Sequence, residues 1–82
     1  MASANHLQVE VVSHEGRLWH GNALAVRVPG IDGSLGILPG RQPLLAQLAV
    51  GRVHVDVADG QMVFEVNGGF ASVDSDFVTV VA

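Results

Sequence analysis

The sequence contains neither cysteine nor lysine in its 82 residues. Without cysteine, the chain has no disulfide framework, no cysteine-ligated zinc site and no cysteine nucleophile. Without lysine, it has no attachment point for a lipoyl or biotin group, no Schiff-base chemistry and no lysine to bind phosphate. These two absences exclude several classes of carrier and enzyme before any motif is considered.

Positive charge is also scarce, since four arginines are the only strongly basic residues. Eight aspartates and glutamates outnumber them, so the net charge is -4. Nucleic-acid binding through counterion release needs clustered positive charge, so nucleic acid is not an expected partner. Although 49% of the residues are hydrophobic, no apolar run approaches the roughly 20 residues of a membrane span. The first residues lack the basic and apolar regions of a signal peptide. We therefore expect no direct insertion into a membrane.

The dominant pattern is an alternation of apolar and polar residues, which is typical of a half-buried strand. It recurs in residues 7–11, 24–28, 53–57 and 62–66, where β-branched valine is frequent. Glycine, proline and aspartate mark turns at short intervals, and Asp59-Gly60 between two alternating runs predicts a hairpin. Residues 43–48 are ambiguous, and we interpret them as a strand or an irregular edge segment.

These patterns predict an all-β fold, an antiparallel two-layer β-sandwich (a flattened barrel) of about eight to ten short strands. The domain is expected to occupy residues 1–82 as a single unit, with residues 1–6 as a flexible N-terminal tail. Residues 29–33 are rich in turn formers and are expected to project from the sheet. Trp19, the one tryptophan, is expected to be partly buried.

No group of residues carries a convincing catalytic or metal-binding pattern. The four histidines show neither the H-x-H nor the i, i+4 spacing of a local chelate, so we interpret them as surface or strand-face residues. The carboxylates of Asp74-Ser75-Asp76 fit a turn, where aspartate caps nearby N–H groups. The glycine-rich residues 30–36 precede no helix, which favours a hairpin or wide loop over a phosphate-binding loop. We expect no catalytic residue, no cofactor and no metal.

One segment is more specific than the alternation. Residues 28–40 have the sequence VPGIDGSLGILPG and are followed by Pro43-Leu44-Leu45. This segment resembles the most recognisable part of the N-terminal β-sandwich domain of the epsilon subunit of bacterial F-type ATP synthases. Residues 11–16 with 18–21 resemble the family's opening hairpin. Residues 59–60 with 64–66 and 68–70 resemble its later hairpin, and residues 78–81 resemble its closing strand. The resemblance runs from about Leu7 to Ala82.

The resemblance implies a non-catalytic rotor subunit of the central stalk, which couples the gamma subunit to the membrane c-ring for proton-driven ATP synthesis. It implies a peripheral location on the cytoplasmic face of the bacterial cell membrane, as part of the complex. Carried over by position, the resemblance places Ile31, Asp32 and Ser34 in a loop that meets the c-ring. In the family, the loops of the c-ring carry basic residues. It assigns the side that faces gamma to Ser13, Arg41 and Ala46.

The chain departs from the family at three places. Family members often carry glutamate at the position of Ser34, and usually His-Ala at the position of Arg41-Gln42. They normally continue into a C-terminal helical hairpin, which in some bacteria binds ATP. This sequence stops at the closing strand, either as a naturally short form or as a shortened chain. We expect no ATP binding in the absence of the helical hairpin.

Two other classes of function remain open from the residues alone. A small cupin-like sandwich would bind a metal or a sugar, and stoichiometric zinc, iron or manganese in the purified protein would favour it. A generic protein-interaction sandwich would bind a partner without copurifying with a rotary complex.

Overall fold

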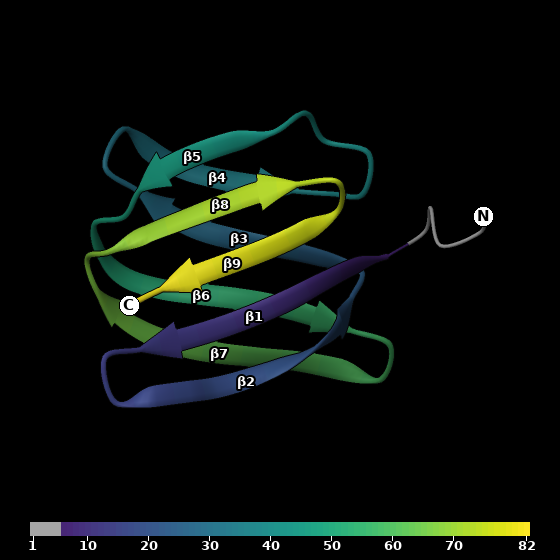
Figure 1. The fold of residues 1–82 in the computed structure, drawn as a ribbon, viewed down its shortest axis with the longest axis horizontal. Coiled ribbons are helices and arrows are strands. Elements are labelled where there is room, and N and C mark those ends of the chain that lie inside the picture. The colour runs from purple at the N-terminus through teal and green to yellow at the C-terminus, as the bar shows by residue number, and fades with distance from the viewer. Residues whose placement is uncertain (1–5) are drawn as a thin grey trace.

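The computed structural model describes residues 6–82, which form nine β-strands and no helix (Figure 1). The strands are β1 (Leu7–Ser13), β2 (Gly16–Ala23), β3 (Ala25–Gly30), β4 (Gly33–Ile37), β5 (Leu44–Gln47), β6 (Val50–Val57), β7 (Gly60–Asn67), β8 (Phe70–Asp74) and β9 (Phe77–Val81). This confirms the all-β prediction and its range of strand numbers. The predicted flexible tail at residues 1–6 lies, apart from His6, outside the described residues.

Two sheets stack face to face (Figure 1). One has five strands in the order β2-β1-β9-β8-β5, and the other has four in the order β4-β3-β6-β7. The strand pairs are antiparallel, as predicted, with one exception: β1 and β9 run parallel in the middle of the five-stranded sheet. A tight turn joins only antiparallel strands. The first and last strands are instead brought together by the whole domain between them.

The core lies between the sheets and follows the predicted alternation. In β1, for example, Leu7, Val9 and Val11 are buried, whereas Gln8 points outward. The buried side chains of the described residues are all apolar and mostly valine, and each such side chain contributes roughly 1.5–3 kcal/mol on burial. Trp19 is half-buried at the margin of this core, with its ring centroid 6.3 Å from that of Phe64, which confirms the expectation for tryptophan.

The turns gather at the two ends of the sandwich (Figure 1). The β1–β2, β3–β4 and β7–β8 connections lie at one end together with the C-terminal residue, and we call this the Ala82 end. The β4–β5, β6–β7 and β8–β9 connections lie at the opposite end, where β1 begins, and we call this the His6 end. Any surface assigned to a partner therefore belongs to one end, or to one of the outer sheet faces between them.

Two predicted turns are present but differ in detail. The β6–β7 hairpin turns at Ala58 and Asp59, because Val57 already pairs with Gly60, so the prediction at Asp59-Gly60 is one residue late. Residues 29–33 were expected to project from the sheet, but only Ile31 and Asp32 do so. Pro29 and Gly30 pair with β4, which leaves two residues in the turn. The ambiguous segment 43–48 contains β5, at the edge of its sheet, as predicted.

Candidate partner interfaces

The β3–β4 turn forms a small exposed tip at the Ala82 end. Ile31 and Asp32 occupy the turn itself, and Ser34 follows on β4; all three are exposed. The backbone N–H of Ile31 donates to the carbonyl oxygen of Gln47 at 3.0 Å, and the N–H of Ala49 donates to that of Pro29 at 2.7 Å. These bonds tie the turn to the end of β5. The three residues assigned to the c-ring loop are thus held close together.

Ala46 lies beside this tip. It sits on β5 opposite the buried Ala71, so its half-buried side chain is on the inner face of the sheet. An open hollow of about 320 Å³ runs between β5 and the tip, lined by residues 30–35 and 45–47. A residue assigned by resemblance to the gamma side therefore shares a hollow with the residues assigned to the c-ring loop.

The β4–β5 loop begins with a tight turn at the His6 end. The N–H of Arg41 donates to the carbonyl oxygen of Leu38 at 3.3 Å, with Pro39 and Gly40 between them. Gly40 has φ +87°, and proline followed by a residue with positive φ is the signature of a type II turn. The LPG sequence therefore determines the shape of this loop and the point at which Arg41 leaves it.

Asp76 attaches this loop to the neighbouring β8–β9 turn. Its Oδ1 accepts a hydrogen bond of 2.7 Å from the N–H of Gly40. Asp76 and Ser75 have φ of 64° and 52°, as in the tight two-residue turns that favour strand twist. The expectation that an aspartate of this turn caps a nearby N–H is confirmed, and the capped group belongs to a different loop.

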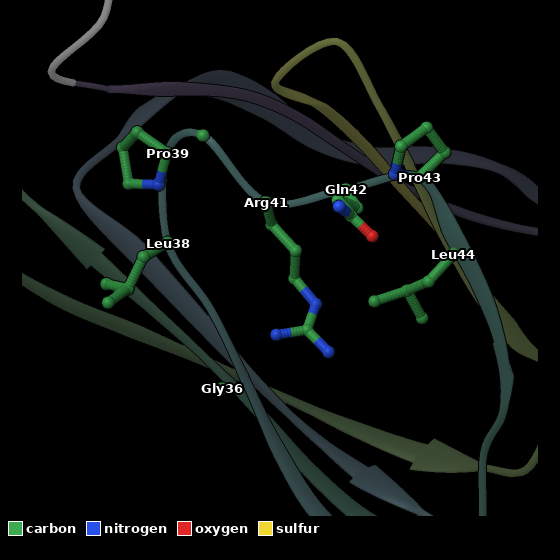
Figure 2. A pocket seen from close by; sticks show the side chains of 8 residues that line it. Gly36, Leu38, Pro39, Arg41, Gln42, Pro43 and Leu44 are labelled. Atoms are coloured by element: carbon green, nitrogen blue, oxygen red, sulfur yellow. The ribbon is translucent and has the colours of Figure 1, made fainter.

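The Arg41 side chain is exposed and hangs from the loop between Leu38 and Leu44, toward Gly36 of β4 (Figure 2). These residues line an open hollow of about 480 Å³. Arg17 and Arg52 pair with Glu10 and Glu65 at 3.0 and 3.7 Å. Arg41 forms no ion pair with any described residue.

Ser13 lies far from Arg41. It ends β1 at the Ala82 end, where its Oγ accepts a 3.2 Å hydrogen bond from the N–H of Glu15. Two strands separate β1 from β5, which corresponds to three strand spacings, or about 14 Å. Ser13, Arg41 and Ala46, all assigned to the gamma side, therefore do not form one cluster. Ser13 and Arg41 lie at opposite ends of the sandwich, and Ala46 lies at the β5 edge with its side chain on the inner face of the sheet.

The outer face of the five-stranded sheet carries an apolar surface that the sequence patterns did not predict. Leu45, Phe70 and Val81 are 72%, 49% and 43% exposed, and we call them the outer apolar patch. Phe70 pairs with Val81 across β8 and β9, and Leu45 is the diagonal neighbour of Phe70 on β5. The signal in the sequence is Val80-Val81, where two consecutive valines break the alternation and must occupy opposite faces.

The outer face of the four-stranded sheet mixes polar groups with two separate exposed valines, Val50 and Val63. His54 Nδ1 lies 3.4 Å from Gln61 Oε1, and Gln61 Nε2 donates to Asp56 Oδ1 at 2.7 Å. Arg52 and Glu65 pair on the same face. Within residues 6–82, no three histidine, aspartate or glutamate side chains are grouped so as to hold a metal ion. None of these residues forms a helix that could cross a membrane.

Comparison with protein families gives one match over most of the chain. The family model described as "ATP synthase, Delta/Epsilon chain, beta-sandwich domain" matches residues 6–82. The ATP synthase epsilon chain of Micrococcus luteus is 47% identical over 77 residues, which cover 93% of this chain and 85% of that protein. The epsilon chain of Rhodococcus jostii is 42% identical over 78 residues, 93% of this chain and 64% of that one.

Other relatives extend further beyond the matched region. The ATP synthase epsilon chain 2 of Ralstonia nicotianae is 48% identical over 68 residues, 82% of this chain but 49% of that protein. This chain therefore spans between about half and 85% of the length of these curated relatives.

Solved structures share the fold. A chain in the Euglena gracilis mitochondrial ATP synthase assembly of OSCP, F1 and c-ring matches with a TM-score of 0.88 at 21% identity, over 95% of this chain and 51% of that one. A chain in the central stalk and c-ring structure of the Tetrahymena thermophila mitochondrial ATP synthase matches with a TM-score of 0.70 at 17% identity, over 93% and 63%.

Proposed function

Because the chain belongs to the family of ATP synthase delta/epsilon chain β-sandwich domains, we propose that it is a non-catalytic central-stalk subunit of an F-type ATP synthase. In this role it joins the gamma subunit to the c-ring so that the two rotate together during proton-driven ATP synthesis. It lies peripherally at the cytoplasmic face of the bacterial membrane. The family match over residues 6–82 favours this role over the cupin-like alternative.

The outer apolar patch is the observation that best supports a subunit role. The sandwich already buries a complete apolar core between its sheets, yet Leu45, Phe70 and Val81 remain exposed on one outer face. An exposed apolar patch is a common site of protein interaction, and these three side chains are neighbours on adjoining strands. We assign this face to the gamma subunit.

The residues assigned to gamma fit one broad surface. A typical interface buries about 800 Å² on each partner, which is wide enough to cross the sheet from Ser13 on β1 to the β5 edge, about 14 Å to the side. The partner must then continue around that edge to meet Arg41 and the inward-facing Ala46. The outer apolar patch lies on the strands that the partner crosses. Ile31, Asp32 and Ser34, at the tip of the β3–β4 turn, are assigned to the polar loops of the c-ring.

Copurification with the proposed partners tests this function. The tagged chain is incubated with the gamma subunit and the detergent-solubilised c-ring of the same organism, first separately and then together. We expect retention of gamma alone, and of the c-ring most strongly when gamma is present. Failure to retain either partner would contradict the proposal. Retention of an unrelated protein in place of both would favour a generic interaction sandwich.

A further inference from the structure

We propose that Arg41 and the hollow beneath it bind a carboxylate side chain of the protein partner that covers the five-stranded sheet. This inference rests on the proposed function, which identifies that partner as the gamma subunit. The ligand is an aspartate or glutamate side chain that enters between Leu38 and Leu44 and meets the guanidinium over Gly36 (Figure 2).

The charge of Arg41 is not neutralised within the chain. All eight carboxylate side chains lie within residues 6–82, and none forms an ion pair with Arg41. Asp76, the aspartate that holds the loop, already accepts the N–H of Gly40. A guanidinium has five N–H donors, so Arg41 can accept an external anion without breaking an existing ion pair.

The walls of the hollow suit an anion attached to a carbon chain. Leu38 is 61% exposed and Leu44 is half-buried, and both flank the arginine (Figure 2). The methylene groups of a glutamate can pack against these leucines while its carboxylate meets the guanidinium fork with two parallel hydrogen bonds. Arg41 is the one basic residue of the lining, and the exposed Arg27 lies on the next strand, opposite Gly36. A single guanidinium in the lining matches the one charge of a carboxylate.

The loop fixes the backbone of Arg41 before the partner binds. The type II turn sets the backbone at Gly40, and the hydrogen bond from Gly40 to Asp76 attaches the turn to the β8–β9 connection. A preorganised site loses less conformational entropy on binding. Leu45, the first residue of the outer apolar patch, directly follows Leu44 of the hollow. The two side chains point to opposite faces of β5, and β5 is the edge strand of its sheet, so a partner that covers the patch meets Arg41 only where it continues around this edge.

Binding of the gamma subunit is the test, measured by calorimetry with the complete chain and variants whose folding is checked by thermal melting. We expect Arg41→Ala to weaken binding by about tenfold or more, as for loss of a hydrogen bond to a charged group. Arg41→Lys should recover only part of the loss, because an ammonium lacks the planar fork. Arg52→Ala, which removes an exposed arginine from the opposite outer face, should bind like the unaltered chain.

Unchanged gamma affinity in Arg41→Ala would overturn the inference and leave the proposed function standing, whereas absent binding by the unaltered chain would overturn the function itself. A charge exchange identifies the partner group. Arg41→Glu should lose affinity and regain it with one gamma variant in which an acidic residue is replaced by arginine. If no such variant restores binding, the ion pair is refuted. Saturable binding of inorganic phosphate that requires Arg41, with gamma affinity unchanged, would instead assign the hollow to a free anion.

Discussion

At the scale of single residues, Gly69 is the position where a side chain fits least. Its φ is +103°, and an added Cβ would collide with the carbonyl oxygen of Val81 on the neighbouring strand. Backbone strain at positive φ costs about 1–3 kcal/mol, and overpacking costs a similar amount. We therefore expect Gly69→Ala to lower the free energy of unfolding by about 3 kcal/mol, measured by urea denaturation.

Gly36→Ala is the matched control for that substitution. Nothing lies within 4 Å of a Cβ at Gly36, and its φ is not positive, so the urea midpoint should stay close to that of the unaltered chain. Equal midpoints for the two variants would show that the close approach of Gly69 to Val81 does not contribute to stability.

Turn residues were the most predictable single positions, because aspartate and glycine tolerate positive φ wherever they occur. What these residues touch was not predictable. Gly69 meets Val81 on the neighbouring strand, and Asp76 caps Gly40 from another loop. Both contacts join residues that are distant in the sequence. They arise from the pairing of strands, which local patterns do not encode.

At the scale of elements, the β3–β4 turn carries a prediction about the c-ring. Asp32 is exposed at the tip, and Ser34 leaves it the only acid there. An exposed ion pair contributes about 0.2–1 kcal/mol. Asp32→Arg, which replaces attraction to the basic ring loops by repulsion, should therefore reduce c-ring copurification several-fold without abolishing it. The melting temperature and gamma binding should change little. Equal loss of both partners would show that the two surfaces are not separate.

The β4–β5 loop carries a second prediction, about Asp76. Asp76→Gly removes the hydrogen bond to Gly40 but keeps a residue that adopts positive φ without strain. Loss of a hydrogen bond to a charged group is worth about 1.5–3 kcal/mol, part of which should appear as weaker gamma binding because the loop no longer holds Arg41. Asp76→Asn retains an acceptor and should bind nearly as well as the unaltered chain. Calorimetry that finds the two variants equal would refute a positioning role.

Strands were predicted well where their two faces differ in polarity, as in β1 and β6, since alternation then reports burial directly. The same rule failed to reveal the outer apolar patch, because it assumes that the outward face is polar. Nor could it predict the parallel pairing of β1 with β9. A side-chain pattern shows that a segment is extended and which face is buried, but it does not determine the neighbouring strand.

At the scale of the whole molecule, the sandwich has two outer faces of different chemistry and two ends with different loops. The four-stranded sheet presents the Arg52–Glu65 ion pair and two separate exposed valines, Val50 and Val63. The five-stranded sheet presents Leu45, Phe70 and Val81, with the Arg17–Glu10 ion pair on its other edge. A subunit that binds gamma on one face and the c-ring at one tip can transmit rotation only if both contacts hold together. The close packing of protein interiors makes the body between them stiff.

Removing the outer apolar patch should therefore uncouple the complex while leaving the domain folded. In the double variant Leu45→Ser, Phe70→Ser, Leu45 is largely exposed and Phe70 is half exposed in the free chain, so the melting temperature should fall only modestly. Apolar anchors at the centre of an interface commonly contribute 2 kcal/mol or more when truncated, and we expect gamma affinity to fall by about tenfold or more. In reconstituted vesicles, ATP-driven proton pumping per ATP hydrolysed should fall as well. Val63→Ser, at an exposed position on the four-stranded sheet, is the control and should change neither the gamma affinity nor the proton pumping. If this control loses as much as the double variant, the assignment of gamma to the five-stranded sheet is wrong.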